Sequence, residues 1–364
     1  MTEPLVGAEG AVWAAFDGGP MINHSLIPVR GARRRVALVA CLLATVLTAH
    51  LGMSATRSTA SEVNEIPAAY KWPVKPFDRQ HPVRGSFGDP RTLFKAQPTM
   101  RSVMSGRGSF SLHRGIDISA PNGSPVYPVM SGVVTYVNHE WLRVDSADGH
   151  AFEYWHLHAV VRNGERVEAH ETVLGHVMAP AMHVHLTELK DEFAVNPLAP
   201  GHIGPYQDTT TPQVTSIALR TPNGRGELLP NRVRGRVAVV AGAEDDPTID
   251  APGQWRGLPV SPALLTWEIR TWQGRHVTKR HIGVDFRSRL PRNAEFWQVY
   301  ARGTYQNMAV FGGHYSWGQR GAYLFKLGSF DTRGLANGAY DLVVVATDTR
   351  GNTGSAKRRF LVSR

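Results

Sequence analysis

Two histidines separated by one residue are the part of the sequence whose spacing first suggests chemistry. His183 and His185 lie in the run Met-His-Val-His-Leu-Thr-Glu, which begins at Met182. Successive side chains of a β-strand point to opposite faces, so both imidazoles would leave one face while Val184 and Leu186 leave the other. Such a pair is more often an ordinary polar pair on a strand surface, and further ligands must decide whether it binds a metal.

Residues upstream of this pair could complete a metal site. A zinc ion that performs hydrolysis usually has three histidine or carboxylate ligands and a water in the fourth position. The sequence offers His113, Asp117 and His185 for this role. Bound zinc lowers the pKa of its water to about 7, which provides hydroxide at neutral pH. His156 and His183 are then candidates to orient the water and to stabilise or protonate the intermediate.

The elements that must position these residues are predicted to be short β-strands. The 364 residues include 36 glycines and 24 prolines, which favours many turns over long helices. Turn residues at hairpin spacing predict an antiparallel sheet with strands at residues 126–129, 132–137, 141–144, 151–157 and 172–177. After residue 205, alternating runs predict an immunoglobulin-like β-sandwich of about seven strands, with runs at residues 214–219, 234–240, 264–270, 322–327, 340–348 and 358–362. The expected fold class is mostly β.

The first 60 residues predict a cytoplasmic leader followed by a signal peptide or membrane anchor. Arginines at positions 30 and 33–35 precede an apolar run at residues 36–47, and small residues follow it. A bilayer span needs about 20 residues, so cleavage of the run is favoured while an uncleaved anchor stays open. Residues 61–81 are predicted to be a linker, and the protein is expected outside the cytoplasm, as a secreted, periplasmic or wall-associated chain.

The net charge limits the classes of binding partner, and the cysteine content limits the kinds of cross-link and metal site. The formal net charge of +10 attracts polyanions, which include nucleic acid, anionic lipid headgroups and bacterial wall polymers. No Lys/Arg run is interleaved with aromatic residues, so we expect no nucleic-acid partner and membrane contact only through the N-terminal segment. Cys41 is the only cysteine, which excludes an intramolecular disulfide and a cysteine-based zinc site.

The order and spacing of the polar residues resemble those of a known family. The spacings are those of His113-x-x-x-Asp117, Tyr154-x-His156 and His183-x-His185. Together they resemble the lysostaphin/LytM-type zinc metallopeptidases, peptidase family M23, over residues 82–198. The flanking run at residues 115–121, Gly-Ile-Asp-Ile-Ser-Ala-Pro, agrees with this family.

The resemblance implies an antiparallel β-sheet peptidase domain of the LytM type at residues 82–204, followed by the immunoglobulin-like sandwich at residues 205–364. It implies Zn²⁺ as the cofactor, held by His113, Asp117 and His185, with His156 and His183 as catalytic histidines. The implied activity is endopeptidase cleavage in the stem or cross-bridge peptides of peptidoglycan. Residues 176–182 differ from the family's glycine-rich approach to the histidine pair, which bears on bond preference.

Two other functions stay open at this stage. The chain could be a non-catalytic regulator of other wall hydrolases, although such relatives lack part of the ligand set. It could also be a cell-wall-binding protein in which the C-terminal sandwich is the working part. The sequence leaves the oligomeric state open.

Overall fold

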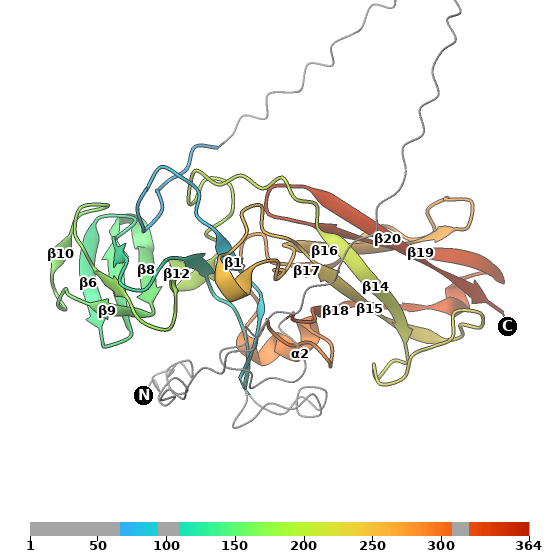
Figure 1. Cartoon of the computed structure of the whole chain (residues 1–364). Coiled ribbons are helices and arrows are strands. Elements are labelled where there is room, and N and C mark those ends of the chain that lie inside the picture. Colours follow the sequence, from blue (N-terminus) through green and yellow to red (C-terminus); the bar gives the residue numbers. More distant parts are fainter. Residues whose placement is uncertain (1–65, 94–108, 308–319, 364) are drawn as a thin grey trace, which may run out of the picture. The chain divides into compact units, whose positions relative to one another are not determined.

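The computed structural model describes residues 66–93, 109–307 and 320–363, which all lie within one compact unit, Glu65–Arg364 (Figure 1). The predicted leader and signal peptide or anchor, at residues 1–60, lie outside the described residues. Within the described ranges, no helix is both long and apolar enough to cross a membrane.

Two of the three predicted metal ligands, Asp117 and His185, belong to an antiparallel sheet of eight strands. The strand order is β1-β4-β12-β8-β7-β6-β10, and β13 pairs with β12. The strands are β1 (Val83–Gly85), β4 (Ile116–Ser119), β6 (Gly132–Val137), β7 (Trp141–Ser146), β8 (His150–Trp155), β10 (Arg166–Val167), β12 (His183–Lys190) and β13 (Phe193–Val195). Two smaller sheets accompany it, formed by β5 (Pro125–Val126), β11 (Gly175–Val177) and β9 (Leu157–Ala159), and by β2 (Pro90–Leu93) and β3 (Ser109–Leu112).

Strand β12 separates the core of this sheet from its polar site. Val184 and Leu186 are fully buried and pack in one hydrophobic cluster with Ile116 and Ile118 of β4. Burying each such side chain contributes about 1.5–3 kcal/mol, which fixes the face that β12 turns inward. His185 lies directly opposite Asp117 in the β12–β4 register, so the two polar side chains share the other face.

The described part of the segment predicted as a linker, residues 66–81, is packed against the sheet. Tyr70 and Trp72 are 4% and 0% exposed, and Tyr70 forms a β-bridge with Ile203. The Nε1 of Trp72 donates a hydrogen bond to the carbonyl of Pro205 over 2.8 Å. The structure therefore differs from the sequence expectation here, because two large aromatic side chains stabilise the segment by burial.

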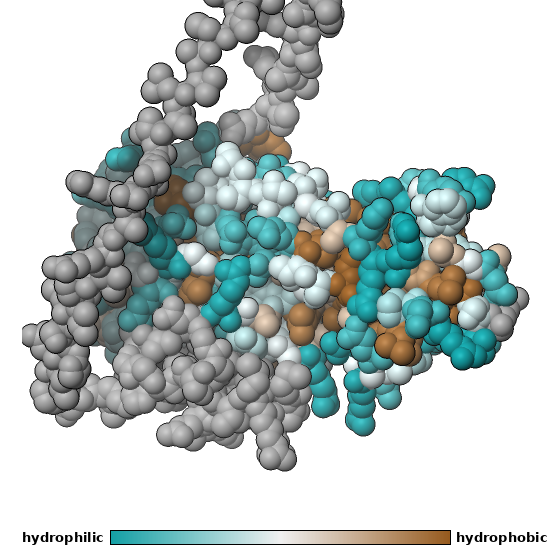
Figure 2. Space-filling model, turned by 45° about the vertical axis from the view of Figure 1, so that its right-hand side comes forward, coloured by the Kyte–Doolittle hydropathy of each residue, from teal (hydrophilic) through white to brown (hydrophobic). Residues whose placement is uncertain are grey.

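The C-terminal residues form two further antiparallel sheets. One contains β14 (Gln213–Arg220), β15 (Arg236–Glu244) and β18 (Leu324–Asp331), and the other contains β17 (His281–Asp285), β16 (Leu264–Thr271), β19 (Gly338–Thr347) and β20 (Thr353–Val362). Residues from both sheets share one buried cluster, so the sheets pack on each other as a sandwich. The mostly β fold class is confirmed; the immunoglobulin-like assignment stays a prediction. On the face shown in Figure 2, hydrophobic residues lie among hydrophilic ones.

Helical structure in the described residues is confined to short segments. They are α2 (Phe296–Val299) and the 3₁₀ turns Ala147–Gly149, Gly253–Trp255, Asn293–Glu295 and Thr332–Gly334.

The turn after β1 is held by hydrogen bonds and packing from residues of the C-terminal half of the chain. The hydroxyl of Tyr300 donates a hydrogen bond of 2.7 Å to the carbonyl of Gly88. The backbone N–H of Ser261 donates one of 2.7 Å to Oδ1 of Asp89. Phe87 is buried in the same hydrophobic cluster as the sandwich residues. The turn that precedes the histidine ligands therefore depends on the C-terminal residues for its position.

Candidate metal centre

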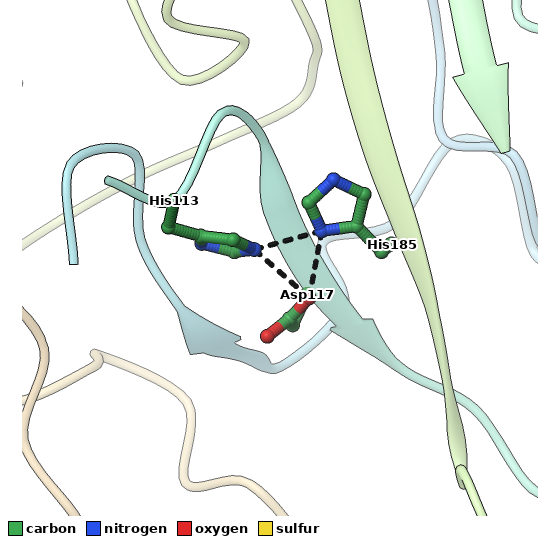
Figure 3. A group of neighbouring side chains, drawn as sticks. All are labelled: His113, Asp117 and His185. Carbon is green, nitrogen blue, oxygen red and sulfur yellow. Dashed lines mark hydrogen bonds and ion pairs between the residues drawn. The ribbon is translucent and has the colours of Figure 1, made fainter. Parts of the chain in front are cut away.

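Three side chains from three places in the fold meet at one point (Figure 3). The Nε2 of His113 lies 2.7 Å from Nδ1 of His185 and 3.1 Å from Oδ1 of Asp117. The same Oδ1 lies 3.1 Å from Nδ1 of His185. His113 precedes β4, Asp117 is on β4 and His185 is on β12; their exposed fractions are 1%, 8% and 5%. The structure thus brings together the three residues that the sequence offered as metal ligands.

Hydrogen bonds orient both imidazoles with a lone pair toward this point. The Nδ1 of His113 is 2.9 Å from the carbonyl of Ser86, which can only accept, so Nδ1 carries the proton and Nε2 does not. The Nε2 of His185 is 2.9 Å from Oγ1 of Thr187, which can accept from it in the same way. Burial, followed by the charge of Arg91, lowers the pKa of His113 to about 3, which keeps its ring neutral near pH 7.

The Asp117 carboxylate is held from its other side by an arginine. Oδ2 accepts a hydrogen bond of 2.7 Å from Nη2 of Arg91. Burial alone would raise the pKa of Asp117, but His113 and Arg91 outweigh it and hold the pKa well below its usual range. A Cβ at Gly85 would lie 2.6 Å from Oδ2, so the close approach of β1 requires a glycine. Asp117 is therefore ionised and offers one oxygen to the cluster.

The donor set fits zinc. Two imidazole nitrogens and one carboxylate oxygen are the ligand types of a catalytic zinc site, and three ligands leave the fourth position open. Ligands held tetrahedrally at about 2.0–2.1 Å from zinc lie about 3.3–3.4 Å apart. The donor atoms lie 2.7–3.1 Å apart, so the three side chains need to separate by only a few tenths of an ångström.

The two histidines predicted to be catalytic lie beside this cluster. The Nε2 of His183 is 3.5 Å from Oδ1 of Asp117, and the ring centroids of His183 and His156 are 4.5 Å apart. His156 follows β8 with φ of 66°, a left-handed conformation that is uncommon for residues other than glycine. Burial, followed by the charge of His183, lowers the pKa of His156 to about 2. Burial, followed by the charge of Arg84, also lowers the pKa of His183.

Arg84 contacts His183 and is a neighbour that sequence reasoning missed. Its Nη2 lies 2.7 Å from Nδ1 and 3.3 Å from Nε2 of His183. Nδ1 is also 2.7 Å from the carbonyl of Ala181 and so carries a proton. The guanidinium, which only donates, can therefore donate to Nε2 alone. Its carbon lies 4.0 Å from the ring centroid of Trp255, a cation–π contact.

In the sequence, Arg84 and Arg91 contribute to the net positive charge, and no motif assigns either of them to the site. The Gly-Ser-Phe-Gly-Asp turn at residues 85–89 lies between them and was the only local signal, because it predicts that the chain bends back there. The partner of each arginine is decided by tertiary contacts with β4 and β12.

Two other polar residues on the strands that carry the site, Glu188 and Tyr154, point away from the cluster. Glu188 faces away from the cluster, where its Oε2 accepts from the hydroxyl of Tyr70 at 2.5 Å and contacts Nδ1 of His202 at 2.7 Å. Tyr154 is fully buried, and its hydroxyl accepts from the N–H of Val129 at 2.9 Å. Tyr154 therefore packs in the core and does not contact the site.

Several solved structures are distantly similar to this chain. Among solved structures, the chain is similar to a zinc-containing peptidase from Vibrio cholerae, with 22% identity over 36% of this chain and 39% of that chain and a TM-score of 0.28. The deep-sea M23 metalloprotease pseudoalterin shares 20% identity over 37% of this chain and 77% of that chain, with a TM-score of 0.23. LytU shares 21% identity over 33% of this chain and 84% of that chain, with a TM-score of 0.23.

The family comparison is more specific. No curated protein matches the chain. Residues 111–197 match the sequence model of Peptidase family M23, and this range contains all five predicted site positions. The match confirms the resemblance and identifies this segment of the chain as a member of peptidase family M23.

Proposed function

We propose that the protein is a zinc-dependent endopeptidase that acts outside the cytoplasm and hydrolyses peptide bonds in the stem or cross-bridge peptides of peptidoglycan. The observation that carries this proposal is the convergence of His113 Nε2, Asp117 Oδ1 and His185 Nδ1, within 3.1 Å of one another, beside two further buried histidines. The substrate class rests on the family and on the net charge of +10, which attracts the anionic polymers of bacterial walls.

His113, Asp117 and His185 would hold the zinc ion. Zinc at this point would lower the pKa of a bound water and polarise a carbonyl oxygen of the substrate. The carbonyl of Ser86 and the hydroxyl of Thr187 fix the ring orientations, so the ligands need little reorganisation on binding.

His183 and His156 would carry out the proton transfer and stabilise the developing charge. Both rings are neutral near pH 7, so each has one nitrogen that can accept a proton and one that can donate a hydrogen bond. The Nε2 of His183, 3.5 Å from Asp117 Oδ1, would orient and deprotonate the attacking water, which would replace the 3.3 Å hydrogen bond from Arg84 as the partner of its lone pair. His156, across from it, would donate an N–H hydrogen bond to the carbonyl oxygen and stabilise the charge that develops there, and His183 would pass the proton taken from water to the leaving amine.

The test combines zinc analysis with digestion of isolated peptidoglycan. Purified protein is assayed for bound zinc by elemental analysis, and new amino termini in the digest are identified by mass spectrometry. Asp117→Ala should lose zinc and activity together, whereas His183→Ala should lose activity and keep zinc. His139→Ala is the matched control, because this side chain is 85% exposed and should change neither quantity.

The proposal fails if the wild-type protein binds one zinc ion and produces no new amino termini from peptidoglycan of any of the tested cross-link types. That result would favour the wall-binding or regulatory function instead.

A further inference from the structure

Three aspartates outside the M23 segment bring their carboxylates together. One oxygen from each of Asp208, Asp245 and Asp348 lies within 4.8 Å of the others. Asp208 belongs to the connection before β14, Asp245 directly follows β15, and Asp348 directly follows β19. Segments that are far apart in sequence therefore place negative charge at one point, where like charges repel.

One of these carboxylates has an unused, buried oxygen. Asp245 is 4% exposed, and its Oδ1 has no hydrogen-bond partner among the described residues. A buried acceptor without a partner is costly, and in native structures it usually marks a bound water or ion. All three aspartates line a cavity of about 20 Å³, which is large enough for one water molecule or one ion.

The charge of the three carboxylates is not balanced by a neighbouring cation. Within residues 66–93, 109–307 and 320–363, no lysine, arginine or histidine forms an ion pair with any of them. The guanidinium of Arg350 lies instead over the ring of Tyr206, 5.1 Å from its centroid. Burial, followed by the charges of Asp208 and Asp348, raises the pKa of Asp245 to about 8. Near pH 7 Asp245 therefore holds a proton, and a bound cation would displace this proton and take its place among the three carboxylates.

Hydrogen bonds hold two of the carboxylates in fixed orientations. Asp208 Oδ1 accepts from Oγ1 of Thr210 at 2.6 Å and from Oγ1 of Thr248 at 2.7 Å. Asp348 Oδ2 accepts from Nδ2 of Asn352 at 2.6 Å. The oxygen atoms are therefore placed before any ligand binds, which reduces the cost of ordering them.

The chemistry of the set selects a hard cation. Carboxylate oxygens without nitrogen or sulfur suit Ca²⁺, Mg²⁺ or Mn²⁺ and disfavour zinc. Ca²⁺ accepts irregular sets of carboxylate, carbonyl and water oxygens, whereas Mg²⁺ requires a near-ideal octahedron and keeps several waters. Three carboxylates from separate connections, around a cavity with room for one ion, match the requirements of Ca²⁺ better.

We propose that Asp208, Asp245 and Asp348 form a Ca²⁺ site that ties the connection preceding β14 to the ends of β15 and β19. The cavity is also lined by Ser86 and Phe87, in the turn whose carbonyl orients His113. Bound Ca²⁺ therefore braces the turn next to the zinc ligands without contacting the zinc site itself. This role is independent of the proposed peptidase activity.

The test measures Ca²⁺ uptake by the full chain saturated with zinc. Isothermal titration with Ca²⁺ gives the stoichiometry and Kd, and Tb³⁺ luminescence gives a second signal, because the hydroxyl of Tyr206 lies 3.2 Å from Asp208 Oδ2 and can sensitise the bound lanthanide. We expect one Ca²⁺ per chain and a melting temperature that rises with Ca²⁺ concentration.

Two variants make the test specific. Asp245→Asn should weaken Ca²⁺ binding at least tenfold and abolish the rise in melting temperature. Near pH 7 the Ca²⁺-free variant should melt close to the Ca²⁺-free wild type, because Asp245 is protonated and uncharged there. Asp250→Asn is the matched control, since its side chain is 58% exposed and pairs with Arg256, and it should bind Ca²⁺ like the wild type.

Several results would overturn the proposal. They are no Ca²⁺ uptake by the wild type at millimolar concentration, equal uptake by Asp245→Asn and wild type, or tighter binding of Mg²⁺ than of Ca²⁺. His185→Ala separates the Ca²⁺ proposal from the zinc proposal, because this variant should lose zinc and keep the Ca²⁺ response.

Discussion

The hydroxyl of Thr187 provides a sensitive test of how the metal centre is organised. Thr187→Val removes the acceptor that lies 2.9 Å from Nε2 of His185 and keeps nearly the same side-chain shape. Thr187 is 1% exposed, so water cannot easily take the place of the hydroxyl. Without it, the His185 ring loses the contact that orients its Nδ1 toward Asp117 and His113. Removing an outer hydrogen-bond partner of this kind typically costs 10- to 100-fold in metal affinity, or about 1.4–2.7 kcal/mol.

The affinity is measured by competition with a chromophoric zinc chelator for the wild type, Thr187→Val and Thr187→Ser. The serine variant keeps the hydroxyl and should bind zinc within about threefold of the wild type, a change of about 0.7 kcal/mol or less. Circular dichroism of the zinc-free proteins controls for misfolding. If Thr187→Val binds zinc as tightly as the wild type in a folded protein, Nδ1 is not the ligand atom of His185 and the proposed tautomer is refuted.

Three further predictions follow from contacts around the site. Gly115→Ala should lower the free energy of unfolding by about 1–3 kcal/mol, because the added Cβ would lie 2.1 Å from the carbonyl oxygen of Leu186. The control Gly334→Ala should be nearly neutral, since its Cβ would have no atom within 4 Å. Equal losses of stability in urea titrations of the two variants would contradict the prediction. The folded-state pKa of His113, about 3, lies below the ordinary value of 6.5, so between these values the unfolded chain binds a proton that the folded chain does not, and stability falls as pH falls. Between pH 6.5 and 4.5 the zinc-free wild type should therefore lose more stability than His113→Gln, by about 1.4 kcal/mol per pH unit; parallel curves would show that the ring is not held neutral. Arg84→Gln removes a charge that lowers the pKa of His183, so the acid limb of the pH–rate profile for hydrolysis should move to higher pH, while Arg256→Gln, a 77% exposed control, should leave it in place.

Strands with regular alternation could be predicted from the sequence. The predicted run at residues 132–137 is β6, and the run at 264–270 is β16 to within one residue. Strand β17 was missed because it is short and buries only Val284, so its pattern does not alternate clearly. The described segment at residues 66–81 has no regular alternation, and its packing comes from a few apolar side chains, Tyr70, Trp72 and Val74, set among polar residues.

The five predicted site positions do come together. Strand periodicity places His183 and His185 on one face, whereas the convergence of the other three positions with them was implied by the family resemblance. The residues that surround them could not be predicted in the same way. Arg91 reaches Asp117, and Arg84 lies between His183 and Trp255, only after β1, β2 and the segment at residues 253–255 have been positioned by the rest of the fold. The partners of long polar side chains are set by tertiary contacts, and local sequence patterns do not indicate these contacts.

The position of β12 between two partners has a consequence for how the chain matures. It pairs with β4 along residues 183–186 and with β8 along residues 185–190, so both neighbours set its register. A slip of one residue would turn Val184 and Leu186 toward the metal point and drive two imidazoles into the hydrophobic interior. A chain that binds zinc tightly has therefore already formed β12 in its native register. Zinc content can then serve as a quality measure for each preparation, since misregistered molecules would be found in the metal-poor fraction.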